Sequence, residues 1–356
     1  MNSNKEKNGF HQLINENLNL NIFFKVLINY IRLIVKFPLL LNIKNKSILE
    51  GSKINFWHLI KNDLYDSYIG YTSVQNLFWI ELFDELLKKM PYQEKGFYTQ
   101  ENQGWEKALI IAWKKYNHGD LHGINNGFIR FWDTRFFEDK RTLEDTDRFR
   151  NPLPDKVILT DRTSLNYYLE YGYNEANIIK AETIRYFDII NKINQKKIND
   201  KIKSSKIKIL ILGDYVLNST HKMLLCLESI NSEKFEWQIK SHPACIINVN
   251  NYKKIQLKDR TNENLTQIIS EFNLVIAPAA TFAVFEAYLA NIDVTVFLDR
   301  EELNISPLRG FENINFVYDK KSLKKMLDFQ MNRKKPNNKN IFWYDENLEE
   351  WKKIFK

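Results

Sequence analysis

The chain has 356 residues, enough for two domains of ordinary size, and its hydrophobic fraction of 44% excludes a disordered protein. Lysine and arginine number 52 against 44 aspartate and glutamate, so the formal net charge is +8 at pH 7. Such a charge favours anionic partners but does not distinguish nucleotides, anionic lipid and nucleic acid. Cys226 and Cys245 lack metal-type spacing and support neither a disulfide scaffold nor a zinc site.

The first apolar segment, Ile22–Leu41, follows a polar start without a recognisable signal peptide, so we expect a cytoplasmic protein. Its three cations, Lys25, Arg32 and Lys36, are rarely tolerated in a membrane-spanning helix. They recur at helical spacing, and a helix would collect them with Asn29 in one polar stripe. The segment is then either an interfacial helix on the inner face of the cytoplasmic membrane or a scaffold helix buried on three sides, with its stripe toward water.

Residues 56–190 mix helical and strand patterns. In chain order we expect a helical region at Phe56–Lys89, a strand at Gly96–Gln100, a helix at Asn102–Tyr116, a strand at His122–Phe131 and a charged connection at Arg135–Arg150. A strand–helix–strand unit follows within residues 156–182. These elements predict a first α/β domain over residues 1–190.

A polar segment at residues 191–206, rich in lysine and asparagine, predicts an interdomain linker. Ile207–Leu212 then reads as a buried strand, and helices and strands alternate as far as a strand at Asp293–Phe297. This alternation is typical of a parallel, doubly wound sheet. We therefore expect a second α/β domain at residues 207–342, followed by a C-terminal helical segment at 343–356.

Two segments of this second domain deliver polar groups to the carboxyl edge of its sheet. One strand ends in Lys240 and is followed by His242, whose imidazole can donate a hydrogen bond to a phosphate, and by Pro243, which stiffens the turn. Another strand leads into a loop with Ala280 and Thr281, where we expect a helix to begin. The small side chains, the hydroxyl and the free amides would then suit an anion, although the same residues also suit a plain helix cap.

Several carboxylates are candidates for the chemistry. Glu286 would lie about one turn inside the expected helix, where it could accept hydrogen bonds from ribose hydroxyls. Asp214 follows the first strand of the second domain and would project toward the interdomain cleft. A carboxylate with a raised pKa can take the proton from an acceptor hydroxyl. Glu101, between a strand and a helix of the first domain, is the preferred base, with Asp133 and Asp214 as rivals.

Other common phosphate and metal motifs are missing from the sequence. Neither G-x-G-x-x-G nor G-x-x-x-x-G-K-[ST] occurs, which argues against a nicotinamide dinucleotide site and a P-loop. The run Asp145-Thr146-Asp147 superficially matches the metal-binding D-x-D of other sugar transferases, but no apolar strand precedes it. We expect no obligatory metal and no cofactor apart from the nucleotide-sugar substrate.

The strand that ends in Lys-x-His-Pro, together with the small-residue loop before a Glu-Ala helix, resembles the GT-B glycosyltransferases, in which two Rossmann-like domains face a central cleft. The His-Pro dipeptide followed by a threonine loop is similar to bacterial sialyl-, polysialyl- and Kdo transferases, which use CMP-activated acidic sugars. This resemblance implies that His242 and Thr281 contact the CMP phosphate and that the base is a first-domain carboxylate, Glu101.

A second resemblance covers residues 56–298. Tyr98–Phe137, with its ENQxWE core, resembles a family of bacterial surface-carbohydrate biosynthesis proteins. The chain departs from these families at three places. The histidine and serine that the ENQxWE family would carry near Asn126-Gly127 are absent, and the threonine loop has one hydroxyl where two are typical. Pro278 stands where retaining GT-B enzymes carry a glutamate upstream of Glu286.

These features predict an inverting, metal-independent GT-B glycosyltransferase of surface polysaccharide synthesis. It would transfer a CMP-activated 2-keto acid sugar to a lipid-linked or oligosaccharide acceptor, with a possible membrane contact through Ile22–Leu41. The alternatives are a UDP- or GDP-sugar transferase or epimerase on the same fold, and a non-catalytic scaffold at the membrane. We do not expect nucleic-acid binding, because no basic and aromatic module is recognisable.

Overall fold

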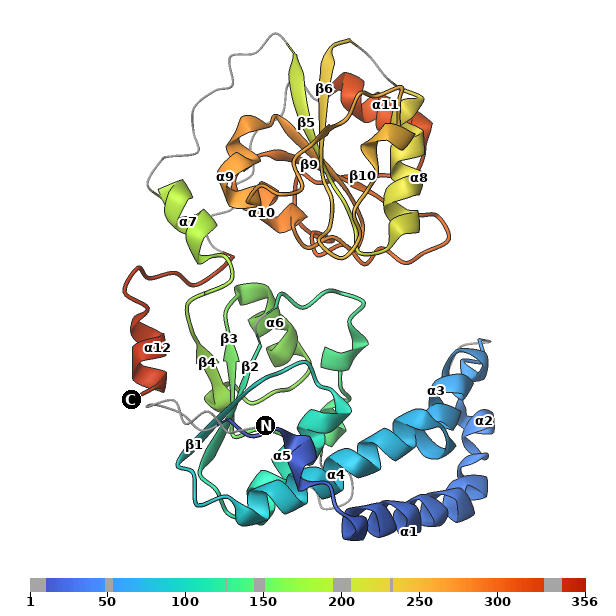
Figure 1. Ribbon diagram of the computed structural model, residues 1–356, viewed down its shortest axis with the longest axis vertical. Coiled ribbons are helices and arrows are strands. Elements are labelled where there is room, and N and C mark those ends of the chain that lie inside the picture. The colour runs from blue at the N-terminus through green and yellow to red at the C-terminus, as the bar shows by residue number, and fades with distance from the viewer. Residues whose placement is uncertain are drawn as a thin grey trace. The chain divides into compact units, whose positions relative to one another are not determined.

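The computed structural model describes residues 11–48, 54–125, 127–143, 151–194, 206–230, 233–329 and 341–356 (Figure 1). Contacts divide the chain into unit 1, residues 1–124 and 139–157, and unit 2, residues 125–138 and 158–356. Most of the expected linker and the run Asp145-Thr146-Asp147 lie outside the described residues. The predicted domain boundaries and the predicted central cleft stay predictions.

The strands form two sheets. Their orders are β1-β2-β3-β4 and β10-β9-β8-β5-β6-β7. The β1–β2 pair and all neighbouring pairs of the six-stranded sheet run parallel, which confirms the expected α/β architecture. The strands are β1 (Lys95–Thr99), β2 (Asp120–Ile124), β3 (Lys156–Leu159), β4 (Ile178–Lys180), β5 (Ile207–Leu212), β6 (Phe235–Lys240), β7 (Lys258–Asp259), β8 (Leu274–Pro278), β9 (Asp293–Phe297) and β10 (Asn315–Val317).

The helices of unit 1 precede and separate its strands. They are α1 (Leu20–Lys36), α2 (Ile43–Lys46), α3 (Trp57–Ile69), α4 (Tyr71–Lys89) and α5 (Gly104–Lys115). Helix α4 packs on both α1 and α5. The start of α5 is fixed by the buried Glu106, whose carboxylate accepts the backbone N–H groups of Glu101 and Gln103, and burial raises the pKa of Glu106.

One expected strand of this region is shorter than predicted. The apolar run His122–Phe131 pairs as a strand only as far as Ile124. The remainder is apolar for another reason, because Phe128 packs within unit 2 against Phe285 and Phe311. The apolar residues after Ile124 are therefore explained by tertiary packing and not by strand pairing.

The helices of unit 2 lie between its strands and after the last of them. They are α6 (Arg162–Glu170), α7 (Phe187–Asn194), α8 (Leu217–Glu228), α9 (Leu265–Ile268), α10 (Val284–Leu289), α11 (Lys320–Phe329) and α12 (Glu349–Ile354). Helix α7 occupies the first residues of the segment that we expected to be a linker, and α12 matches the expected C-terminal helix. Thr281 was expected to begin a helix, but α10 begins only at Val284 because residues 278–281 form a turn in which Thr281 N–H bonds Pro278 O.

The central strand β5 explains why the six-stranded sheet is stable. Its side chains alternate between two apolar clusters, with Leu210 and Leu212 in one and Ile209 and Ile211 in the other. All four are almost completely buried, which is the pattern of a strand covered on both faces. The order of strands also reverses at β5, since β6 lies on one side and β8 on the other. In parallel sheets the crevice at such a reversal is the usual ligand site.

Helix α6 begins at Asp161, whose buried carboxylate accepts hydrogen bonds from the backbone and hydroxyl of Ser164. Burial raises the pKa of Asp161 to about 6, against the opposing effect of those hydrogen bonds. An unfolded aspartate has a pKa of about 3.9, so between about pH 4 and 6 the folded chain keeps a proton that the unfolded chain has lost. The contribution of Asp161 to stability is therefore greatest at low pH and falls as pH rises through this window.

We expect this pH dependence to disappear in Asp161→Asn, which keeps an oxygen for the Ser164 N–H and carries no charge. The free energy of unfolding of the wild type should lose about 2 kcal/mol more than that of the variant between about pH 4 and pH 7. Urea denaturation at the two pH values measures the difference. Equal pH dependence in the two proteins would show that Asp161 titrates normally.

Helix α1 is less buried than the scaffold alternative predicts. Among its described side chains only Ile22 and Val26 are buried, and they pack with Leu82 of α4. The expectation of a helix buried on three sides is therefore wrong: α1 contacts α4 and α3, but most of its side chains are exposed. No helix among the described residues is long and apolar enough to cross a membrane.

Candidate functional site

A cavity of about 520 Å³ lies in unit 2 at the carboxyl ends of β5, β6 and β8. This is the crevice that the strand order indicates, and its volume is within the usual range for small-molecule sites. Seventeen residues line it: Arg130, Arg185, Tyr186, Leu212, Gly213, Asp214, Tyr215, Lys240, Ser241, His242, Pro243, Leu265, Ala280, Thr281, Phe282, Ala283 and Glu286. The predicted phosphate-binding residues of the second domain are all among them.

Gly213 allows the ends of β5, β6 and β8 to approach one another. A Cβ at this position would lie 3.0 Å from the backbone nitrogen of His242 and 3.2 Å from Cα of Ser241, so a side chain would push the two strand ends apart. On the other side, the hydroxyl of Thr281 donates to the carbonyl of Gly213 at 3.3 Å. His242 and Thr281 therefore reach the same cavity from neighbouring strand ends. The hydroxyl of Thr281, however, is already engaged by the protein.

The imidazole of His242 is oriented by its own turn. Its Nδ1 accepts the backbone N–H of Ala244 at 3.2 Å. In the neutral ring the proton therefore sits on Nε2, which becomes a hydrogen-bond donor. Lys240 adds a positive charge nearby, although its ammonium group already donates to the carbonyls of Thr261 and Glu263.

Two arginines that the sequence analysis did not identify complete the positive side of the cavity. The guanidinium of Arg130 lies 4.9 Å from the ring centroid of Phe282, and that of Arg185 lies 5.3 Å from the same centroid. Within the described part of the chain, no carboxylate lies within 4.0 Å of either guanidinium. Two guanidinium groups thus share one aromatic ring in the cavity, and Glu286, the carboxylate on which the charge of Arg185 acts, is not within ion-pair distance of either. Such an arrangement suits an anionic ligand.

Two buried polar atoms at the cavity also lack a partner among the described residues. Asp214 is only 1% exposed, and its Oδ1 accepts the N–H of Val216 while Oδ2 accepts nothing. The hydroxyl of Tyr186 is likewise buried and unpartnered, and burial raises the pKa of Tyr186 to about 12, which keeps it protonated. Buried polar groups in folded proteins almost always have hydrogen-bond partners, so a ligand with hydroxyl groups would complete this wall.

Glu286 lies inside α10 as expected and lines the cavity. Its Oε2 accepts the hydroxyl of Thr266 at 3.1 Å. Burial raises the pKa of Glu286, while this hydrogen bond and the charge of Arg185 act in the opposite direction. The carboxylate retains lone pairs that could accept hydrogen bonds from a ligand.

The candidate bases are distributed over both units. Glu101 is an exposed residue of unit 1, between β1 and α5. Asp133 accepts two hydrogen bonds of 2.8 Å from Arg135 and does not line this cavity. Of the three candidates, only Asp214 lines the cavity of unit 2. The assignment of the base stays a prediction.

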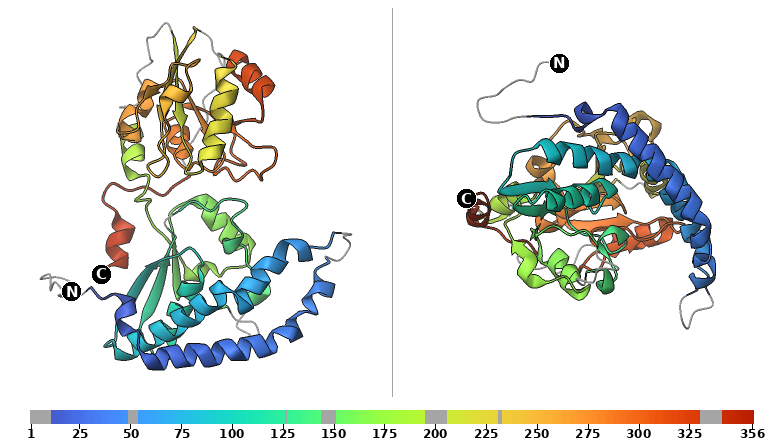
Figure 2. Two further views of the ribbon diagram at one scale, coloured as in Figure 1. Left: turned by 45° about the vertical axis from the view of Figure 1, so that its right-hand side comes forward. Right: turned by 90° about the horizontal axis from the view of Figure 1, so that it is seen from below.

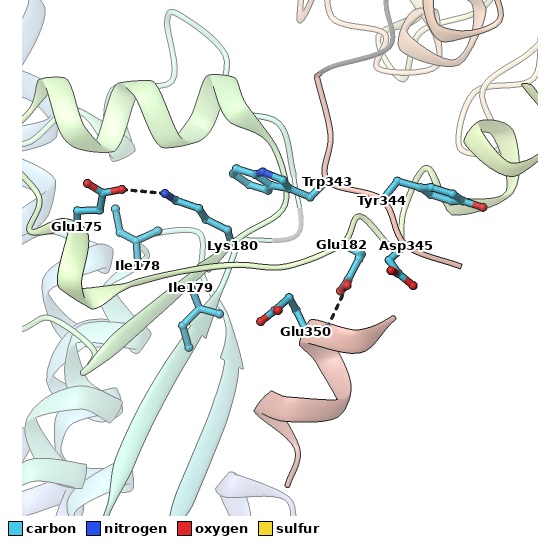
Figure 3. Close-up of a pocket in the computed structure, with 9 residues that line it drawn as sticks. All are labelled: Glu175, Ile178, Ile179, Lys180, Glu182, Trp343, Tyr344, Asp345 and Glu350. Atoms are coloured by element: carbon cyan, nitrogen blue, oxygen red, sulfur yellow. Dashed lines mark hydrogen bonds and ion pairs between the residues drawn. The ribbon is translucent and has the colours of Figure 1, made fainter. Parts of the chain in front are cut away.

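A larger cavity of about 730 Å³ in unit 2 has the opposite electrostatic character (Figure 3). Four carboxylates line it: Glu175, Glu182, Asp345 and Glu350. Its one ammonium group, on Lys180, pairs with Glu175 at 2.8 Å. Glu182 accepts the N–H of Glu350 in the first turn of α12, and Trp351 donates to the carbonyl of Glu182. The hydrogen bonds of Glu182 therefore hold the C-terminal helix in place, and the carboxylates around this cavity would repel a phosphate.

No protein-family model matches the chain, and no curated protein matches it. Solved structures do resemble it. UDP-GlcNAc 2-epimerase from Methanocaldococcus jannaschii has 13% identity over 80% of this chain and 83% of its own, with a TM-score of 0.48. MurG from Acinetobacter baumannii has 11% identity over 72% and 70%, with a TM-score of 0.43. Anabaena Alr3699/HepE in complex with UDP and glucose has 11% identity over 69% and 70%, with a TM-score of 0.40.

All three TM-scores lie below 0.5, a level at which a likeness supports no functional conclusion. The function has to be inferred from the residues of the cavity.

Proposed function

We propose that unit 2 binds a nucleotide-linked sugar in the cavity at β5, β6 and β8, and that the chain is a glycosyltransferase of the GT-B type. One observation carries the proposal: Arg130 and Arg185 lie against the same ring of the cavity without a carboxylate partner among the described residues. The guanidinium fork matches phosphate oxygens in two parallel hydrogen bonds. The Nε2–H of His242 adds a third donor on the wall formed by the strand ends.

This charge favours a nucleoside diphosphate over the CMP-linked donor expected from the resemblance. A CMP-activated 2-keto acid sugar presents one phosphate and, at a distance, the carboxylate of the sugar, whereas a UDP- or GDP-linked sugar presents two adjacent phosphates. Two guanidinium groups against one ring match two adjacent phosphates better than a phosphate and a separate carboxylate, because each charge in a partly dehydrated site needs a partner close to it. The UDP- or GDP-sugar alternative is therefore preferred to the CMP-activated 2-keto acid sugar.

The neutral and anionic groups of the same cavity suit the rest of a nucleotide sugar. Glu286 would accept hydrogen bonds from ribose hydroxyls, and the unpartnered Oδ2 of Asp214 and hydroxyl of Tyr186 would accept and donate to sugar hydroxyls. In a transfer, the bond between the sugar C1 and the phosphate oxygen breaks and the acceptor oxygen bonds to C1. The nucleoside diphosphate leaves, and the acceptor proton passes to a carboxylate base. Glu101, Asp133 and Asp214 remain the candidates for that base.

Thermal unfolding with UDP, GDP and CMP tests the donor class. A nucleotide present at a hundred times its dissociation constant stabilises the folded protein by about 2.7 kcal/mol, so a bound nucleotide raises the melting temperature measurably. We expect UDP or GDP to do so at concentrations at which CMP does not. A larger shift with CMP than with either diphosphate would restore the CMP-linked donor.

Incubation with the corresponding nucleotide sugars then separates the possible reactions. Release of the nucleoside diphosphate that depends on a glycan acceptor identifies a transferase, and an unchanged rate in EDTA would support metal independence. Conversion to an isomeric sugar without an acceptor identifies an epimerase. Nucleotide binding without either product would favour the non-catalytic scaffold.

A further inference from the structure

The outward side of α1 carries an unusual amount of exposed apolar surface. Helix α1 lies alongside α4, and in both views no other element of unit 1 covers its opposite side (Figure 2). At 3.6 residues per turn, the exposed side chains fall on one broad face opposite Ile22 and Val26. The members of this face, which we call the outer face, are Leu20, Phe23, Phe24, Leu27, Ile28, Ile31, Ile34 and Val35.

The apolar surface continues beyond α1. The 3₁₀ helix at Phe37–Leu40 adds the exposed Leu39, and the following residue, Leu41, is also exposed. Single exposed apolar residues are normal in soluble proteins, but a contiguous apolar face of this length marks a surface that contacts another protein or a membrane.

The charged residues around the outer face indicate which kind of partner it contacts. Residues 17–49 contain no aspartate or glutamate and five cations: Lys25, Arg32, Lys36, Lys44 and Lys46. The three cations within α1 form a stripe along one flank of the outer face, between it and α4. Lys25 on this stripe pairs with Glu81 of α4 at 3.2 Å, and Arg32 donates to Asn29. Long basic side chains on the flank of an apolar helix can reach lipid phosphates while the helix lies in the plane of the membrane surface.

We propose that the outer face of α1 docks unit 1 on a membrane surface that contains anionic phospholipid. The apolar side chains enter the boundary between headgroups and acyl chains, and the cationic flank meets the phosphates. A second copy of the chain fits less well, because a two-fold contact through this face would bring two cationic stripes together without an acidic residue in the segment to separate them. The inference is independent of the nucleotide site and stands if that site proves wrong.

Co-sedimentation of the full chain with lipid vesicles tests the proposal. We expect binding to mixed phosphatidylglycerol and phosphatidylcholine vesicles, and much weaker binding to phosphatidylcholine alone or at high salt. Ile31→Glu should lower the partition coefficient by about tenfold or more, since it places a charge in the apolar contact. Joint replacement of Arg32 and Lys36 by glutamine should weaken binding to the mixed vesicles and leave the weak binding to phosphatidylcholine unchanged.

The matched control is Leu225→Glu on α8. Leu225 is 48% exposed and Ile31 is 52% exposed, so both substitutions place a charge at a similarly exposed apolar helix position. This variant should bind vesicles like the wild type. Three results would overturn the proposal: no vesicle binding by the wild type, equal loss in both variants, or a wild-type dimer in light scattering that Ile31→Glu converts to a monomer without any vesicle binding. Circular dichroism confirms that each variant is folded.

Discussion

Replacing Arg185 by glutamine is expected to weaken the binding of UDP by about ten- to a hundredfold. A hydrogen bond to a charged group contributes about 1.5–3 kcal/mol, and each 1.4 kcal/mol corresponds to a factor of ten in affinity. Glutamine keeps much of the side-chain volume and can still contact Phe282, but it has no charge and no fork of donors. Arg130→Gln should have an effect of similar size, because both guanidinium groups lie against the same ring. Isothermal titration calorimetry measures both.

The matched control is Arg162→Gln. Arg162 also lies over an aromatic ring, with its guanidinium 5.7 Å from the centroid of Trp343, but it does not line the cavity. Its replacement should leave the affinity for UDP unchanged. Wild-type affinity in both Arg130→Gln and Arg185→Gln would remove the basis for a diphosphate in this cavity.

The largest loss of stability is expected for Phe285→Ala. Phe285 is fully buried in α10, and its ring contacts the rings of Phe128, Tyr186, Phe311 and Phe342. Truncating a buried phenylalanine removes its apolar contacts and leaves a cavity, at a cost of about 3–5 kcal/mol. Urea denaturation followed by circular dichroism should show this decrease in the transition that reports unit 2. Phe285→Leu, which fills most of the space, should lose much less.

Phe24→Ala provides the comparison for the same chemical change at an exposed position. Phe24 lies on the outer face of α1, where its ring has few contacts to lose, and alanine favours the helix. We expect a change in the free energy of unfolding of less than about 0.5 kcal/mol. A loss of similar size in the two alanine variants would mean that the ring cluster around Phe285 does not stabilise unit 2.

The sequence predicted the four inner strands of the second sheet, β5, β6, β8 and β9, because most of their residues are buried. The short edge strands β7 and β10 were not predicted. The segment Ile207–Leu212, apolar except for Lys208 and rich in isoleucine, was predicted as a strand, and β5 matches it residue for residue. His242 could be located for the same reason, since a polar residue directly after such a strand must lie at the sheet edge. The start of α10 was harder to predict, because Thr281 suits a helix cap and a turn equally well.

The two arginines could not be found by periodicity. Arg130 and Arg185 lie in irregular segments that precede β5 in the chain and are far in sequence from the ends of β6 and β8. Only the tertiary fold brings them to Phe282. A cationic residue inside an otherwise apolar run, such as Arg130 in Phe128–Trp132, was the available signal. In α1 the amphipathic pattern predicted the polar stripe, but only coordinates could show which apolar side chains remain uncovered.

Amide hydrogen exchange with and without UDP tests the central claim most directly. We expect UDP to slow exchange in three separate segments, at residues 213–216, 240–245 and 279–286, which surround the two arginines and His242 in the cavity of unit 2. Protection confined to residues 175–182 and 343–350, around the carboxylate-lined cavity, or no protection at all, would contradict it.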